Sequence, residues 1–134
     1  ERFVQSVREY SAALPIIINL PVLGAEQHAW GKQLGCRGTQ KMYRFNILRA
    51  NQMLIEAYGN REDEFIFLSP MFLNLDPEYG FPKEGYRANK YAEDVVEHQS
   101  NWVHPNEQGY CQMGDVLGGV LEKIRGLSST KGGG

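Results

Sequence analysis

Residues 15–21 read Pro-Ile-Ile-Ile-Asn-Leu-Pro, an apolar, β-branched run with a proline at each end. A continuous apolar run without polar alternation is typical of a strand that is covered on both faces, as in a parallel sheet. Pro21 has no N–H to donate to a neighbouring strand, so we expect the strand to end there. The run therefore predicts a buried parallel strand.

Helical patterns lie on both sides of this strand, and a second strand follows. Residues 1–14 place apolar side chains at helical spacing, and a longer helix is predicted over residues 41–58, with Gly59 as part of its stop signal. Residues 64–68, Glu-Phe-Ile-Phe-Leu, predict a second short buried strand. Buried strands that alternate with amphipathic helices indicate an α/β fold with a parallel sheet.

The second half of the chain is less regular. Residues 71–100 carry several turn signals, and a short helix is predicted over residues 88–96. A last amphipathic helix is predicted from Pro105 to about Arg125, and its expected apolar face consists of Tyr110, Met113, Leu117, Val120, Leu121 and Ile124. We expect residues 1–126 to form one unit and residues 127–134 to form a flexible tail or linker. Because two strands are too few to build such a sheet, the chain is expected to be part of something longer.

Composition and charge exclude several classes of partner. The 134 residues are 42% apolar and 22% charged, and 14 basic against 16 acidic residues give a net charge of −2. A nucleic-acid track or an anionic membrane surface would require a basic excess. No run approaches the roughly 20 apolar residues of a membrane span. Cys36 and Cys111 are either free thiols, which we favour, or a pair, and no metal-type spacing or cofactor is indicated.

The most informative motif is residues 101–110, Asn-Trp-Val-His-Pro-Asn-Glu-Gln-Gly-Tyr. Proline after His104 fixes the chain and suits the first turn of a helix, so we expect the His104 ring to be aimed into a cleft beside the sheet. The motif resembles the last conserved block of SGNH/GDSL-type serine ester hydrolases. In that family Asp-x-x-His-Pro-Asn precedes a Gly-Tyr pair and the final helix.

This resemblance implies that the chain is the C-terminal half of a three-layer α/β/α, flavodoxin-like SGNH hydrolase fold. His104 would be the general base that takes a proton from a serine hydroxyl and returns it to the leaving alcohol. No Gly-Asp-Ser or Gly-x-Asn-Asp occurs here, so the nucleophilic serine and the oxyanion hole are expected from a missing N-terminal half. The chain alone is not expected to be active. Expected substrates are acetyl or short acyl esters, among them acylated carbohydrate, and Trp102 is expected either to line the substrate cleft or to pack in the core.

Asn101 stands where the resemblance places the aspartate that orients the histidine. An amide oxygen can accept a hydrogen bond, but it lacks the charge that stabilises an imidazolium, and in a serine protease this exchange costs ~10⁴ in turnover. Three interpretations stay open: a weakened or dead enzyme, a histidine that acts without a charged partner, or a substitute carboxylate from Glu93, Asp94 or Glu97. The alternative function is a catalytically impaired module that binds carbohydrate or has a structural role in a larger assembly.

Overall fold

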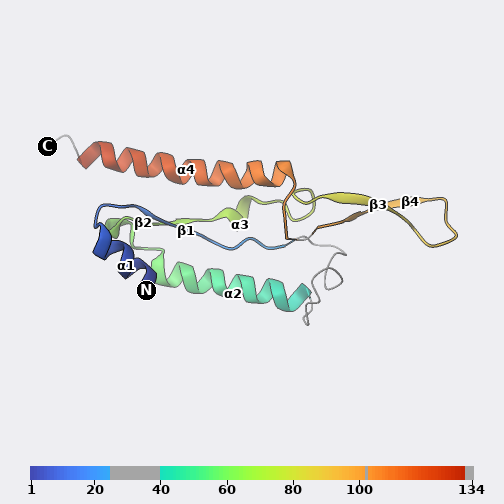
Figure 1. Cartoon of the computed structure of the whole chain (residues 1–134), viewed down its shortest axis with the longest axis horizontal. Helices are drawn as coiled ribbons and strands as arrows, with labels where there is room; N and C mark the ends of the chain where they lie inside the picture. The colour runs from blue at the N-terminus through green and yellow to red at the C-terminus, as the bar shows by residue number, and fades with distance from the viewer. Residues whose placement is uncertain (25–39, 102, 132–134) are drawn as a thin grey trace.

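The computed structural model describes residues 1–24, 40–101 and 103–131 (Figure 1). The α/β class predicted from the sequence is confirmed as a small parallel sheet with helices. The elements in chain order are α1 (Arg2–Tyr10), β1 (Ile16–Asn19), α2 (Gln40–Tyr58), the 3-10 helix η1 (Glu62–Glu64), β2 (Ile66–Ser69), α3 (Met71–Asn74), β3 (Lys83–Arg87), β4 (Val95–Gln99) and α4 (Glu107–Lys131).

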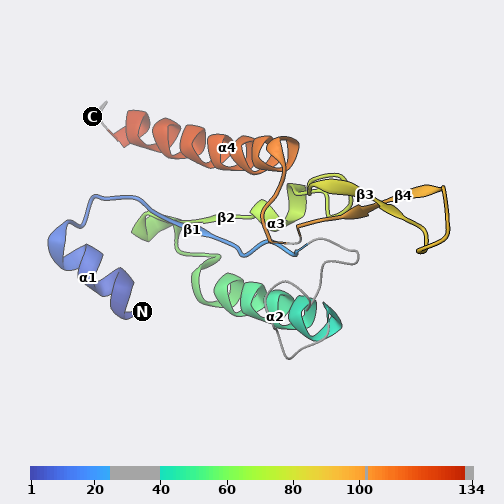
Figure 2. The same ribbon diagram turned by 45° about the vertical axis from the view of Figure 1, so that its right-hand side comes forward.

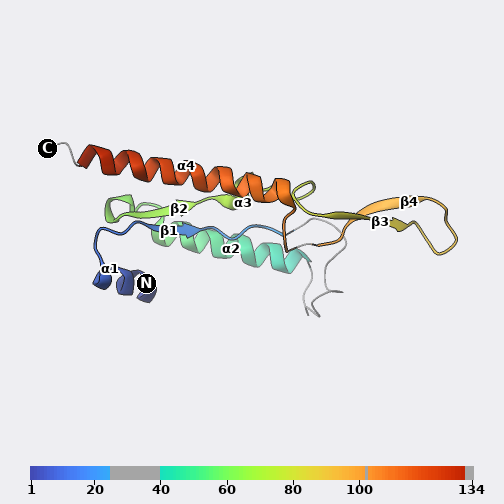
Figure 3. The same ribbon diagram turned by 45° about the horizontal axis from the view of Figure 1, so that its top comes forward.

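β1 and β2 form a two-stranded parallel sheet in which Ile16 lies opposite Ile66 and Asn19 lies opposite Ser69. α4 runs along one face of this sheet, and α1 and α2 lie on the other face (Figures 1 and 3). Ile66 and Ser69 are fully buried, whereas β1 is half-buried and ends in the exposed Asn19. β2 is therefore the more buried of the two strands, and its apolar character matches the burial of parallel strands on both faces.

Two apolar clusters hold these layers together. The larger one lies between the sheet and the first two helices, and its buried members are Val4, Ile16, Tyr58 and Ile66. The smaller one lies where the start of α4 meets the segment after β1, and its members are Leu75 and Phe81 with the partly buried Val22, Tyr43 and Met113. The second cluster fixes the position of the chain that precedes α4, which contains the predicted site.

The prediction of a short helix over residues 88–96 is wrong, because β3 and β4 form an antiparallel hairpin there. The Ala88 N–H donates to the Asp94 carbonyl at 3.0 Å and closes the hairpin end. Val95 and Val96 are β-branched, which lowers helix propensity and favours a strand once a partner strand is available. Cross-strand pairing therefore overrides the local helical pattern.

α4 is longer than predicted. It continues past Arg125 to Lys131, so most of the segment predicted as a flexible tail is helical. The Ser128 hydroxyl donates to the Ile124 carbonyl at 3.0 Å, one turn earlier, and Ile124 is buried against the body. The predicted apolar face is only partly confirmed, because Tyr110 and Leu121 on it are about half exposed.

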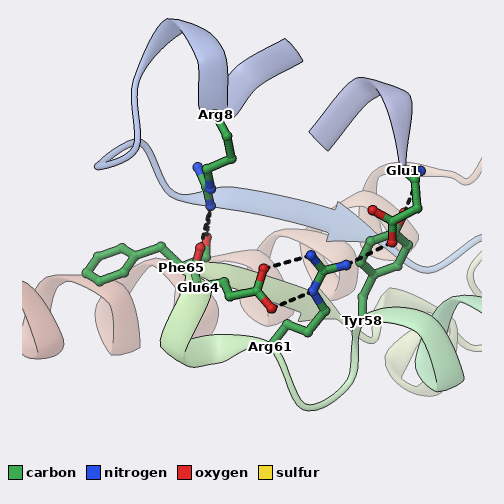
Figure 4. Close-up of polar contacts among 6 residues, drawn as sticks. All are labelled: Glu1, Arg8, Tyr58, Arg61, Glu64 and Phe65. Carbon is green, nitrogen blue, oxygen red and sulfur yellow. Dashed lines mark hydrogen bonds and ion pairs between the residues drawn. The ribbon is translucent and has the colours of Figure 1, made fainter. Parts of the chain in front are cut away.

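A polar network joins α1 to the turn before β2 (Figure 4). Arg8 donates to the main-chain carbonyls of Glu64 and Phe65, and Arg61 pairs with both carboxylate oxygens of Glu64 at 2.8 and 2.7 Å. These hydrogen bonds raise the pKa of Arg61 and lower the pKa of Glu64. The turn holds Phe65 in the left-handed region at φ 57°. Consequently β2 begins at Ile66 and not at Glu64 as predicted.

Candidate functional site

His104 lies in the short segment that joins β4 to α4, just before the helix begins at Glu107. Its side chain is exposed, whereas the next residue, Pro105, is buried. The start of α4 is fixed beside α3, which follows the carboxyl end of β2: the Asn74 side chain donates to the Gln112 carbonyl at 2.9 Å. Ligand sites of open parallel sheets lie outside the carboxyl ends of the strands. The His104 segment is therefore on the side of the sheet where such sites form.

Asn106 is the N-cap of α4 and also its anchor. Its side-chain oxygen accepts the Gly109 N–H at 2.9 Å, and its own N–H donates to the Gly80 carbonyl at 2.9 Å. Its side-chain nitrogen donates to the carbonyls of Tyr79 at 2.8 Å and Phe81 at 3.2 Å. One residue thus satisfies a helix-end N–H and ties the helix to the turn at residues 79–81.

A glycine is required at position 109 by the contact between α4 and the turn at residues 79–81. A Cβ atom at this position would lie 2.3 Å from the Gly80 carbonyl oxygen and 2.8 Å from the Pro105 Cβ. Pro105, Asn106 and Gly109, three residues of the motif, are thus explained by the docking of α4 on this turn. His104 is not explained in this way, because its side chain is exposed.

We expect Gly109→Ala to destabilise the fold by about 1–3 kcal/mol, because the added methyl group overlaps a backbone carbonyl that cannot move aside freely. Gly118→Ala in the same helix meets no atom within 4 Å and should be neutral or stabilising by up to about 1 kcal/mol. Urea unfolding of the two variants and the parent measures both effects. Equal stability of Gly109→Ala and the parent would contradict the docking contact.

Asn101 shapes the backbone that leads to His104. Its side-chain oxygen accepts the N–H groups of Val103 at 3.0 Å and His104 at 2.9 Å, which is an Asx-type turn. Within the described part of the chain, the hydrogen bonds of this oxygen go to the backbone and not to the His104 ring. The predicted hydrogen bond from the His104 ring to the Asn101 amide oxygen stays a prediction.

The substitute carboxylates are unfavourably arranged. Glu93 and Asp94 precede β4, so the whole length of that strand separates them from the His104 segment. A five-residue strand spans roughly 17 Å, and the hairpin points away from α4 (Figure 2). Glu97 is exposed in the middle of β4. This geometry disfavours Glu93 and Asp94 as partners of His104.

Two residues fix the loop beside the site, and sequence reasoning missed one of them, Gln99. Gln99 is buried, and its side-chain nitrogen donates to the carbonyls of Pro77 at 2.7 Å and Glu78 at 2.9 Å. The Asp76 carboxylate accepts the N–H groups of Tyr79 and Glu78, and these bonds lower its pKa. The Asp-Pro pair indicated a turn in the sequence, but nothing local indicated Gln99 as its partner.

Two residues named in the sequence predictions, Trp102 and Cys36, lie outside the described residues. Cys111 is an exposed free thiol on the first turns of α4. Among the described residues no three His, Cys, Asp or Glu side chains gather as a metal site would require. None of the described helices combines the length and the apolar character of a membrane span.

Comparison of the chain with models of known protein families, with curated proteins and with solved structures finds no match.

Proposed function

We propose that this chain is the C-terminal half of an SGNH-type serine ester hydrolase with a three-layer, flavodoxin-like fold, and that His104 is its general base. The observation that carries the proposal is the exposed side chain of His104 on a short segment that is fixed at both ends. Ser100 N–H donates to the Pro82 carbonyl at 3.0 Å at one end, and Asn106 is anchored to Gly80 at the other. Such a support holds a reactive side chain in a defined direction, as catalysis requires.

In this mechanism the imidazole takes the proton of a serine hydroxyl as the oxygen attacks the ester carbonyl. It then returns that proton to the leaving alcohol, and a water molecule releases the acyl group in a second cycle. The serine and the donors that stabilise the oxyanion come from the N-terminal half of the enzyme. The substrates are acetyl or other short acyl esters, including those carried by carbohydrate.

The surface around β1 supports a partner half. In the described part of the chain β1 pairs with β2 alone, although parallel sheets are normally covered and extended on both sides. Phe45, Leu48 and Ile55 are exposed on α2, and Phe45 keeps 62% of its surface accessible. Large exposed apolar side chains on a helix that packs on the sheet, together with a strand that has one unpaired edge among the described residues, are suited to further strands and helices.

The alternative function is a module without catalysis, which binds carbohydrate or links parts of an assembly. The observation that favours it is the engagement of the Asn101 oxygen by two backbone N–H groups, because this leaves the amide NH₂ as the group that can turn to the ring. An NH₂ donor cannot stabilise an imidazolium.

Acyl-enzyme formation distinguishes the two functions. The complete protein that contains this chain is mixed with an aryl acetate, and separately with a fluorophosphonate that labels activated serines. The enzyme hypothesis predicts a burst of about one aryl alcohol per active site. It also predicts a phosphonate on a serine outside residues 1–134, and heat-unfolded protein is the control for chemical labelling. If neither a burst nor a label is found, the enzyme hypothesis is contradicted and the non-catalytic module is the function that remains. A label on Ser69 or another serine of this chain would contradict the proposal that the nucleophile comes from a missing N-terminal half.

A further inference from the structure

The β3–β4 hairpin projects from the body as an arm (Figures 1 and 2). Its base is fixed, since Gln99 is buried on the loop at residues 76–81 and the Lys83 ammonium lies 4.3 Å from the centroid of the Tyr79 ring. Beyond the base every side chain of β3 is exposed. An isolated two-stranded hairpin is marginally stable in water, so an anchored arm with exposed rings suggests a ligand surface.

One face of the arm carries a mixed set of side chains. The register pairs Glu84 with His98 and Tyr86 with Val96, so these four residues, the hairpin platform, share a face. The Tyr86 hydroxyl donates to the Glu84 carboxylate at 3.1 Å, and the Tyr86 and His98 rings are tilted by 32° with centroids 6.0 Å apart. Tyr86 and Val96 remain more than 40% exposed. The platform thus offers aromatic and aliphatic surface beside a carboxylate.

The chemistry of the platform fits a sugar better than a protein or an anionic polymer. The C–H face of a pyranose ring can stack on an aromatic ring while the sugar hydroxyls donate hydrogen bonds to a neighbouring carboxylate. The core of a protein interface is depleted of charge, whereas the platform carries the Glu84 carboxylate beside the exposed Tyr86 ring. Residues 83–99 hold three basic and four acidic residues, which leaves no basic excess for a polyanion.

The arm also leads to the proposed site. β4 runs from Val95 through His98 to the buried Gln99, and the chain then enters the His104 segment. The exposed Tyr79 lies at the base of the arm, and its carbonyl accepts a hydrogen bond from Asn106 at 2.8 Å. A polymer on the platform would therefore extend toward His104.

We infer that the hairpin platform binds a neutral carbohydrate chain and presents its acyl groups to the His104 site. The presentation of acyl groups rests on the proposed function. The binding of the sugar chain itself needs no catalysis and can be measured separately.

The test is calorimetric titration of the complete protein with xylohexaose, an unacylated neutral oligosaccharide. Tyr86→Ala should weaken binding about tenfold by removing the stacking surface, and Tyr86→Trp should keep or tighten it. Glu84→Gln should weaken binding while the hairpin stays paired. The control is Tyr10→Ala, which removes an exposed tyrosine from α1 at the other end of the molecule and should bind like the parent.

Absence of xylohexaose binding, or equal affinity of Tyr86→Ala and the parent, would overturn the inference even if the protein hydrolyses an aryl acetate. Suppose that binding depends on Tyr86 but the protein gives neither a burst nor a phosphonate label. This result would support oligosaccharide binding by the platform and contradict the proposed esterase activity.

Discussion

His104→Ala in the complete protein is expected to lower kcat for an aryl acetate by at least about 10³-fold, because no other group would take the serine proton in the transition state. KM should change little, since the imidazole acts mainly as charge develops. The His104 side chain is exposed, so the free energy of unfolding should stay within about 0.5 kcal/mol of the parent. Steady-state kinetics and urea unfolding on the same preparations separate catalysis from folding.

The matched control is Gln108→Ala, an exposed position one turn further along the chain, on α4. It keeps the N-cap and should retain full kcat. A His104→Ala variant that kept a tenth or more of the parent kcat would show that the base is another residue.

The parallel strands were predictable because each corresponds to a short run of mainly apolar residues in the local sequence. Residues 66–68 are apolar without alternation and mostly buried, as such a run predicts, whereas residues 16–20 form the predicted strand but are only partly buried and include the exposed Asn19. β3 reads Lys-Glu-Gly-Tyr-Arg and has no buried face at all. Its strand conformation depends on pairing with β4 and on the anchor at its base, so the short window around residues 88–96 was misleading.

Only part of the candidate site could be predicted from the sequence. Pro105, Asn106 and Gly109 sit at fixed spacing, so the start of α4 could be predicted from local helix-capping rules. Their partners were not visible, because Gly80 and the turn around it are more than twenty residues away and become neighbours only when α4 docks. The same limit applies to Asn101, whose turn with the His104 N–H reflects backbone geometry that spacing alone does not reveal.

Asn101→Asp should raise kcat of the complete protein on an aryl acetate, with a ceiling of about 10⁴-fold, if the esterase proposal holds. The turn is expected to survive, because one carboxylate oxygen can accept the Val103 and His104 N–H groups as the amide oxygen does now. The second oxygen replaces an NH₂ donor with an acceptor that can bond to the imidazolium. The gain should appear in kcat and not in KM, since the attraction grows only as the ring gains its proton.

Asn101→Ala is the control for the turn, because it removes both backbone hydrogen bonds without adding charge, and it should lower kcat by loosening the His104 segment. The double variant Asn101→Asp with His104→Ala should stay inactive, which ties any gain to the histidine. An inactive parent that Asn101→Asp restores would identify the natural chain as a module that lost catalysis through this one charge. A parent that is active and gains nothing from Asn101→Asp would require another group to hold the His104 ring. In that case Asn101 would serve the backbone alone, through the two hydrogen bonds that it already makes.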